Sequence, residues 1–467
     1  MFMIKIAKRI AIVLSIFLVL AFIIAHFMVP EYFDRQFTTT LTSAPTQPVS
    51  AQADKLHKTL TICDLHSDAL IWGRNLTKKN SLGQVDIPRL LEGNVALQIF
   101  SVPTLVPKKK SQWGTSRSGL DWLTVASVVG WWPINSWFSL FSRADYMSEE
   151  LSSIAKKEEN FTLIKSVRDL NMYLTKRTSD KSITAGMLAL EGMHPLENNF
   201  ENLDKLFHMG YRMMGLVHFF DNEIGGSSYG LQAGGITKLG ERCIQRMEEL
   251  GIIVDLAHAS DSLIDAVLQI ATKPVVVSHT GIKGVCNRKR NISDKHALLI
   301  CEQGGLIGIG FWRGAVCGDD VGAIVRSIMY VVDLVGIDHV TLGSDFDGDR
   351  CIIDAARLNE LTEALLNASF SPREIRLIMG ENLIRFLQKS LPNSKILSQD
   401  LQNLIMQPLS VAYPAAIICF YVFAEFIKHT HWRPFGLADF FGVSRFNFFS
   451  QRIGCENMCH PGQDSCR

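Results

Sequence analysis

The sequence has almost no net charge and contains no long basic tract. Its 467 residues include 47 Lys and Arg against 46 Asp and Glu, which gives a formal net charge of +1. Nucleic-acid-binding proteins usually carry a basic stripe or patch, so this balance excludes nucleic acid as the expected partner and favours a small molecule. The ten cysteines are mostly scattered and do not define a small disulfide-stabilised scaffold.

Eight short apolar runs recur between residues 59 and 348, and each ends in a His, Asp, Glu or other polar residue. Their length is typical of buried parallel strands, and the segments between them show helical periodicity. Eight such units predict an α/β fold of the (β/α)8 TIM-barrel type, in which the carboxyl ends of the strands build the active site. The runs are residues 59–68, 94–102, 183–192, 213–220, 252–260, 274–280, 305–312 and 339–348.

The N-terminal region contains a hydrophobic run over residues 10–29, preceded by three basic residues. A run of this length can cross a bilayer as a transmembrane helix, and the basic residues place the rest of the chain in the periplasm or outside the cell. A cleaved signal peptide is the alternative, but its apolar core is normally about 7 to 15 residues long. We therefore expect a membrane anchor over residues 1–35 and a polar, poorly ordered stalk over residues 36–56.

Two further regions lie outside the barrel pattern. Five of the eight tryptophans fall within residues 113–141, in an insertion predicted over residues 104–150. We expect a helical lid there; a hairpin dipping into the membrane is the alternative, since Trp favours the bilayer interface. A helix over residues 371–389 begins with a capping-box pattern, and residues 393–467 then form an appendage of unknown role. Within it, residues 409–427 are a candidate second membrane segment, while the terminal cysteines fit no closed zinc motif.

Five candidate metal ligands end four of the runs. His66 and Asp68 are two residues apart, so on a strand they would share one face. Glu191 closes the third run, where a carboxylate is costly to bury without a cation, although a salt-bridged core glutamate is the alternative. His258 and His279 end the fifth and sixth runs. A single His in such a run is more often a hydrogen-bonded core residue, but two at equivalent positions are hard to explain in that way. Because a carboxylate can bridge two ions, these residues predict a pair of zinc-like ions.

Other polar residues are expected at the same end of the barrel. Asp345, in the eighth run, is a candidate proton shuttle or a partner for a substrate ammonium, with a helix cap as the alternative. His218, in the fourth run, could donate a hydrogen bond to a developing oxyanion. The basic stretch at residues 287–291 supplies an Arg that could grip a carboxylate, unless it is a solvated loop. Cys286 and Cys317 could form a disulfide outside the cytoplasm, with free thiols as the alternative.

The motifs DLHSD, VDIPRL, LEGMH, VDLAHAS, VSHTG with the following RKRNISD, GSDFDG and GENLIRFL occur in this order between residues 60 and 388. In order and spacing they resemble the membrane (renal-type) dipeptidases, zinc metallopeptidases related to the amidohydrolase barrels. The resemblance implies a dipeptidase domain over residues 57–392, a dipeptide substrate, two zinc ions and a homodimer. It also implies the ligands: His66, Asp68 and Glu191 for one ion, and Glu191, His258 and His279 for the other.

The resemblance further implies how the residues act. A hydroxide bridging the two ions, both held by Glu191, would attack the peptide, and His218 would polarise the scissile carbonyl. Arg290 would hold the C-terminal carboxylate; it is preferred to Arg288 because it directly precedes an Asn. Asp345 would contact the free amino group and move the proton. Hydrolysis of another amide or a lactam at the same site is one alternative, and an inactive membrane-tethered binding protein is another.

Three features depart from the resemblance. Mammalian members carry a Tyr near the position of Trp312, so one polar contact to the substrate is expected to be lost. The Trp-rich insertion is longer than usual, and the C-terminal appendage has no counterpart. Mammalian members are also lipid-anchored at the C-terminus, whereas the anchor expected here is N-terminal.

Overall fold

A closed parallel sheet forms the centre of the protein. The computed structural model describes residues 2–41, 48–107, 114–115 and 121–393. Strands run in the order β2-β1-β9-β8-β7-β6-β5-β4-β3, and an additional pairing of β2 with β4 closes eight of them into a barrel. The predicted (β/α)8 fold is therefore confirmed. The strands are β1 (Ile62–Ser67), β2 (Val95–Pro103), β3 (Phe161–Leu163), β4 (Thr184–Glu191), β5 (Tyr211–Gly215), β6 (Ile253–Asp255), β7 (Val276–Thr280), β8 (Leu306–Ile309) and β9 (Val340–Leu342).

Each predicted run overlaps one of the eight barrel strands, but β3 was not predicted. It pairs with the first half of β4, from Thr184 to Gly186, whereas β5 pairs with the second half. Three residues are too few for an apolar period to be recognised. Strands β5 and β6 also end earlier than predicted, so His218 and His258 lie in the loops that follow these strands.

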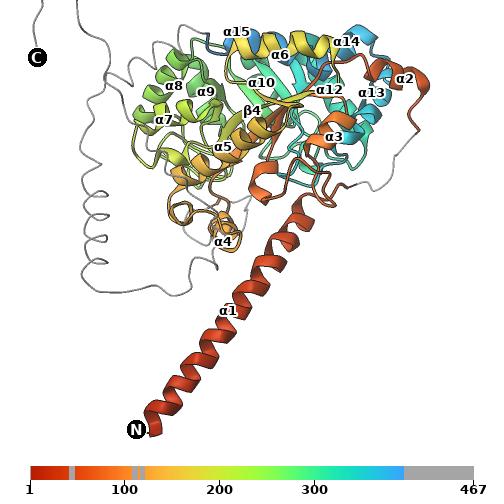
Figure 1. Cartoon of the computed structure of the whole chain (residues 1–467). Coiled ribbons are helices and arrows are strands. Elements are labelled where there is room, and N and C mark those ends of the chain that lie inside the picture. Colours follow the sequence, from red (N-terminus) through yellow and green to blue (C-terminus); the bar gives the residue numbers. More distant parts are fainter. Residues whose placement is uncertain (1, 42–47, 108–113, 116–120, 394–467) are drawn as a thin grey trace, which may run out of the picture. The chain divides into compact units, whose positions relative to one another are not determined.

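Helices alternate with the strands, and most of the helices surround the barrel, whereas the first, α1, points away from it (Figure 1). Among the described residues these are α1 (Phe2–Phe37), α2 (Ala51–His57), α3 (Ile87–Glu92), α4 (Trp122–Val129), α5 (Leu140–Lys157), α6 (Val167–Ser179), α7 (Asn202–Met209), α8 (Lys238–Leu250), α9 (Asp261–Ile270), α10 (Asp294–Glu302), α11 (Arg313–Val316), α12 (Val321–Val335), α13 (Leu358–Asn367), α14 (Pro372–Arg376) and α15 (Asn382–Ser390). Apart from residue 393, the appendage, with its candidate membrane segment and terminal cysteines, lies outside the described residues.

The helix predicted over residues 371–389 is interrupted. The predicted capping box is present, since Ser371 and the side chain of Glu374 cap each other's backbone. Between α14 and α15 lies a π-helical turn, Leu377–Glu381, in which Gly380 has non-helical dihedral angles. A Cβ atom at Gly380 would overlap the carbonyl oxygen of Thr61. Glycine is therefore needed where this helix passes the residue before β1.

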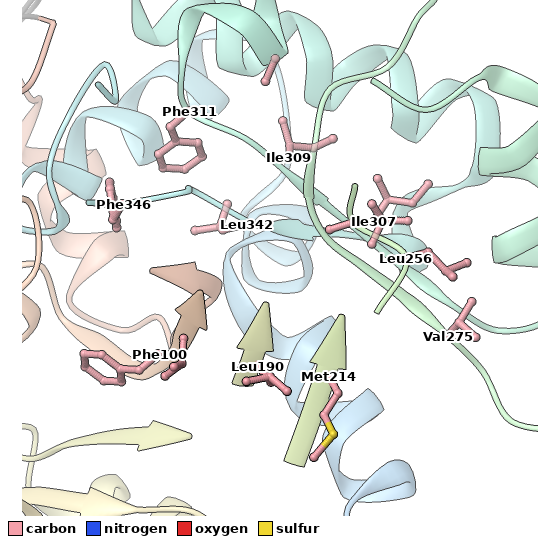
Figure 2. Close-up of a cluster of buried hydrophobic side chains, with 14 of the residues drawn as sticks. Phe100, Leu190, Met214, Leu256, Val275, Ile307, Ile309, Phe311, Leu342 and Phe346 are labelled. Carbon is pink, nitrogen blue, oxygen red and sulfur yellow. The ribbon is translucent and has the colours of Figure 1, made fainter. Parts of the chain in front are cut away.

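The core consists of apolar side chains from the strands and from the helices that cover them. Figure 2 shows Phe100, Leu190, Met214, Ile307 and Leu342, from five different strands, in one buried cluster. Each of them is at most 1% exposed. Full burial of such a side chain contributes about 1.5–3 kcal/mol to folding. This packing gives the loops at the carboxyl ends of the strands a rigid base.

Helix α1 leads away from the barrel (Figure 1). Within its part Arg9–Phe37, an 18-residue window has a mean hydropathy of 2.9, so this part is long and apolar enough to cross a membrane. The helix continues two residues beyond the predicted end of the anchor. Ser50 accepts a hydrogen bond from the backbone of Ala53 and so begins α2. The stalk prediction is therefore wrong for residues 51–56, because this N-cap makes them helical.

Candidate active site

Four imidazoles surround one carboxylate at the mouth of the barrel. The Oε1 atom of Glu191, the last residue of β4, lies 2.9 Å from Nε2 of His258 and 3.4 Å from Nε2 of His279. The corresponding distances are 3.5 Å to His218 and 3.7 Å to His66. All five side chains are buried. Residues from four separate strand ends and loops thus converge on a single oxygen atom.

Two further carboxylates extend this cluster. Nε2 of His66 lies 3.4 Å from Oδ1 of Asp68 and 3.9 Å from Oδ1 of Asp345. The ligand atoms form three overlapping groups, each with its atoms within 4.8 Å of one another: His66, Glu191 and His279; Glu191, His218 and His258; and His66, Asp68 and Asp345. The seven residues therefore form one connected cluster. This grouping places His279 beside His66, and Nε2 of His279 also lies 3.1 Å from Nε2 of His258, so the division of ligands between two ions stays a prediction.

The chemistry of this cluster fits divalent cations. Within the described part of the chain, Nε2 of His66 and Oε2 of Glu191 are buried without a hydrogen-bond partner. Burial, and then the negative charge of Asp68, raise the pKa of Glu191 well above its usual value. Burial lowers the pKa of His258 well below its usual value, which favours the neutral imidazole. A neutral imidazole and a buried carboxylate in need of a counter-charge are suitable ligands for a zinc-like ion.

Ser278, in the middle of β7, orients an imidazole of the cluster. Its hydroxyl donates a hydrogen bond to Oδ2 of Asp255 at 2.6 Å and lies 2.9 Å from Nδ1 of His279. Because the single hydroxyl proton is used on Asp255, the oxygen accepts from Nδ1–H of His279. Nε2 of a neutral His279 then keeps its lone pair and faces Glu191. Asp255 and Ser278 were not predicted, although a carboxylate inside an apolar run is a signal that could have identified Asp255.

A second buried carboxylate, Asp64, joins β1 to the loop that carries Asp345. Its Oδ1 accepts from the backbone N–H of Ser344 at 2.8 Å, and its Oδ2 accepts from Nε2 of Gln98 at 2.7 Å. The pKa of Asp64 is raised overall, because burial raises it more than these hydrogen bonds lower it. Sequence reasoning also missed this residue. Its interactions fix the backbone immediately before Asp345.

Two predicted site residues have unusual backbone conformations. His258 and Asp345 both have φ values of 65°, in the left-handed region that side-chain-bearing residues seldom occupy. Each such residue costs about 1–3 kcal/mol and is typical of functional sites. Beside them, a Cβ atom on Gly348 would overlap Oδ1 of Asp345 and lie 2.7 Å from Oδ2 of Asp68. Glycine at this position thus leaves room for two carboxylates of the cluster.

All predicted site residues except His66 line one cavity of about 540 Å³. Arg290 is buried in it and donates from Nη2 to the carbonyl oxygen of His279 at 2.9 Å. Arg288, in the same loop, is exposed. The ring of Trp312 also lines the cavity, 5.9 Å from the ring of His279. The cavity therefore combines a guanidinium, carboxylates, imidazoles and aromatic rings.

A disulfide closes the loop that carries Arg290. Cys286 and Cys317, which follow β7 and β8, are bonded with their Cα atoms 5.4 Å apart. The other described cysteines, Cys63, Cys243, Cys301 and Cys351, are free and buried. Of the two alternatives left open by the sequence, the structure thus contains the disulfide.

The fold and the cluster define the class of protein. A (β/α)8 barrel with imidazoles and carboxylates gathered at the carboxyl ends of its strands is typical of metal-dependent hydrolases. The chain belongs to the membrane dipeptidase family, peptidase family M19, whose family model matches residues 50–398. It is therefore a metallo-dipeptidase, a hydrolase of peptide bonds, and the resemblance seen in the sequence is confirmed.

Individual relatives agree with this membership. Dipeptidase aclJ of Aspergillus oryzae is 26% identical over 348 residues, which cover 70% of this chain and 77% of that protein. A metallo peptidase from Rhodobacter sphaeroides, solved with a phosphinate mimic of the dipeptide L-Ala-D-Ala, superposes with a TM-score of 0.58 at 21% identity over 71% of this chain and 99% of its own. The probable dipeptidase PvdM from Pseudomonas aeruginosa gives a TM-score of 0.60 at 20% identity, over 73% and 98% of the two chains. The two solved structures show a shared fold.

Proposed function

We propose that this protein is a zinc-dependent dipeptidase whose barrel lies in the periplasm or outside the cell. The observation that carries the proposal is the convergence of four buried imidazoles on Oε1 of Glu191. A buried carboxylate needs a cation for its charge to be stable. Family membership makes that cation part of a peptidase site.

Five residues would hold two zinc ions. His66, Asp68 and Glu191 are proposed for one ion, and Glu191, His258 and His279 for the other. When bound, such ions lower the pKa of water, so that hydroxide is available at neutral pH, and polarise the peptide carbonyl. Ser278 and Asp255 would keep His279 in the tautomer that binds a cation.

The remaining side chains would bind the substrate by both ends. The buried guanidinium of Arg290 suits the C-terminal carboxylate, and Asp345 suits the free ammonium group. His218 would donate a hydrogen bond to the oxygen of the scissile carbonyl as negative charge develops on it. Asp345 would then deliver a proton to the leaving nitrogen. Charged groups that bind both ends of the substrate within one cavity restrict it to two residues, which supports dipeptides over longer peptides.

Two features support the extracytoplasmic location. Basic residues precede the apolar part of α1, which orients the chain with its barrel outside the cytoplasm. The disulfide between Cys286 and Cys317 fits an oxidising compartment. We accordingly propose an N-terminal membrane anchor, a dipeptidase domain over residues 57–392 with an insertion over residues 104–150, and a separate C-terminal appendage. The homodimer suggested by the resemblance stays a prediction.

The test is to measure metal content together with hydrolysis of a small panel of substrates. The purified full-length protein should contain about two zinc ions per chain. It should hydrolyse dipeptides, lose activity with a chelator and regain it when zinc is added. β-Lactams and N-acyl amino acids belong in the same panel. Faster turnover of either class than of every dipeptide would favour the alternative amide or lactam hydrolase, and a zinc-loaded but inactive protein would favour a binding protein.

A further inference from the structure

The cavity has an apolar half that the proposed chemistry does not use. On this side its lining comes from α1, the 3-10 turn Ala69–Trp72 and the Trp-rich insertion: Val29, Pro30, Phe33, Phe37, Trp72 and Trp122. We call these six residues the apolar annex. It is continuous with Glu191, His258 and Asp345, which line the same cavity. The end of the anchor helix is therefore part of the wall of the candidate active site.

Contacts along α1 hold this wall against the insertion. The rings of Phe33 and Trp122 lie 4.5 Å apart, and those of Phe22 and Trp131 lie 5.0 Å apart. Between these two contacts, Nδ1 of His26 is 2.6 Å from the carbonyl oxygen of Val129 at the end of α4. Three contacts over about three turns fix the helix on the insertion rather than leaving it as a free tether.

The base of α1 is also connected to the loop that carries Asp345. Nη1 of Arg74 lies 3.7 Å from Asp34 of α1, and its Nη2 lies 2.8 Å from Oδ2 of Asp347. Nε1 of Trp72 donates to the carbonyl oxygen of Asp347 at 2.8 Å, and the ring of Trp72 stacks on Phe37. The apolar annex is thus attached two residues from Asp345, the proposed partner of the substrate ammonium.

We propose that the apolar annex binds the side chain of the first residue of the dipeptide, and that it favours a bulky apolar side chain there. The inference rests on the proposed function, because Asp345 fixes which end of the substrate lies beside the annex. A cavity with charged groups on one side and aromatic rings on the other matches a dipeptide with an apolar first residue. The anchor helix is then a determinant of specificity as well as a candidate membrane segment.

The experiment compares Phe-Gly, Gly-Phe and Gly-Gly as substrates of the full-length, zinc-loaded protein in detergent. In Phe33→Ala, kcat/KM for Phe-Gly should fall about 10-fold, mainly through KM, while Gly-Gly changes less than about twofold. Val29→Trp, which fills the apolar annex, should produce the same selective loss, although it makes the cavity smaller whereas Phe33→Ala makes it larger. Met28→Ala is the matched control, because Met28 lies on the same helix but is 64% exposed. Thermal unfolding of each variant checks that the protein is folded.

Each outcome decides the inference. A loss confined to Phe-Gly in both variants supports it, and a loss confined to Gly-Phe overturns it by placing the second residue in the apolar annex. Equal losses for all three dipeptides in folded variants also overturn it, since α1 would then only support the site. If the wild-type protein hydrolyses Gly-Gly and neither substitution changes kcat/KM for any of the three dipeptides, the inference fails and the dipeptidase proposal stands. If zinc-loaded wild-type protein hydrolyses none of them, both fail.

Discussion

The two halves of the cavity are built in different ways. In the polar half, the side chains come from short motifs at the ends of strands or in the loops that follow them, and Ser278 and Asp255 orient His279 by hydrogen bonds. In the apolar half, the lining comes from α1 and the insertion, and ring contacts such as Phe33 on Trp122 hold it. The polar half is therefore fixed by the barrel, whereas the apolar half depends on elements added to it.

Because of this difference, we expect the polar half to determine catalysis and the apolar half to determine which dipeptides are preferred. Changes in the polar half should affect all dipeptides alike, because they act on metal binding or on substrate groups that every dipeptide has. Changes in the apolar annex should depend on the substrate. A uniform loss of metal or turnover in variants of the polar half would support this division, and losses that depend on the substrate would contradict it.

The largest expected effect is that of His258→Ala. This residue approaches Glu191 more closely than the other three histidines, and its removal should abolish detectable turnover of every dipeptide and release metal. The loss of zinc affinity should exceed the roughly 10–100-fold effect typical of residues that only orient a ligand. Zinc content and kcat are the measurements. His208→Ala, the same substitution at an exposed position, is the control, and normal zinc content in His258→Ala would remove this residue from the proposed ligands.

The next effect is that of Arg290→Ala, which should mainly raise KM, by about 100-fold, because a buried guanidinium paired with a carboxylate is worth roughly 2–5 kcal/mol. The rise should be the same for Phe-Gly and Gly-Gly. Arg288→Ala is the matched control, since Arg288 is exposed in the same loop. A fall in kcat at unchanged KM would contradict the assigned role in binding.

The barrel could be predicted because buried parallel strands read as continuous apolar runs, but these runs report burial rather than strand pairing. Leu216 and Val217 continue the fourth run and are buried, yet they lie in a loop after β5. The predicted ends of β5 and β6 were therefore too late. Strand β3 was missed because three residues are too few to show a hydrophobic pattern.

The polar half of the site could be predicted and the apolar half could not. His66, Glu191 and His279 are residue types whose chemistry is recognisable at the end of an apolar strand. Asp255, which acts through Ser278, has no such direct role and was missed. The packing of α1 on the insertion was not predicted either. Apolar residue types do not indicate which other apolar segment they will pack against, whereas His, Asp and Glu residues indicate metal binding.

The smallest of these effects is expected for Ser278→Ala, which tests whether the second layer of hydrogen bonds holds the polar half together. The substitution removes the acceptor for Nδ1–H of His279, so the imidazole loses its fixed tautomer and orientation. Zinc affinity should fall about 10–100-fold, and excess zinc should restore much of kcat for Phe-Gly and Gly-Gly alike. A zinc titration of activity measures this, and Ser278→Thr, which keeps the hydroxyl, should lie closer to the wild-type protein. If Ser278→Ala instead lost activity only toward Phe-Gly, the polar half would also contribute to selectivity, and the division between the two halves of the cavity would be wrong.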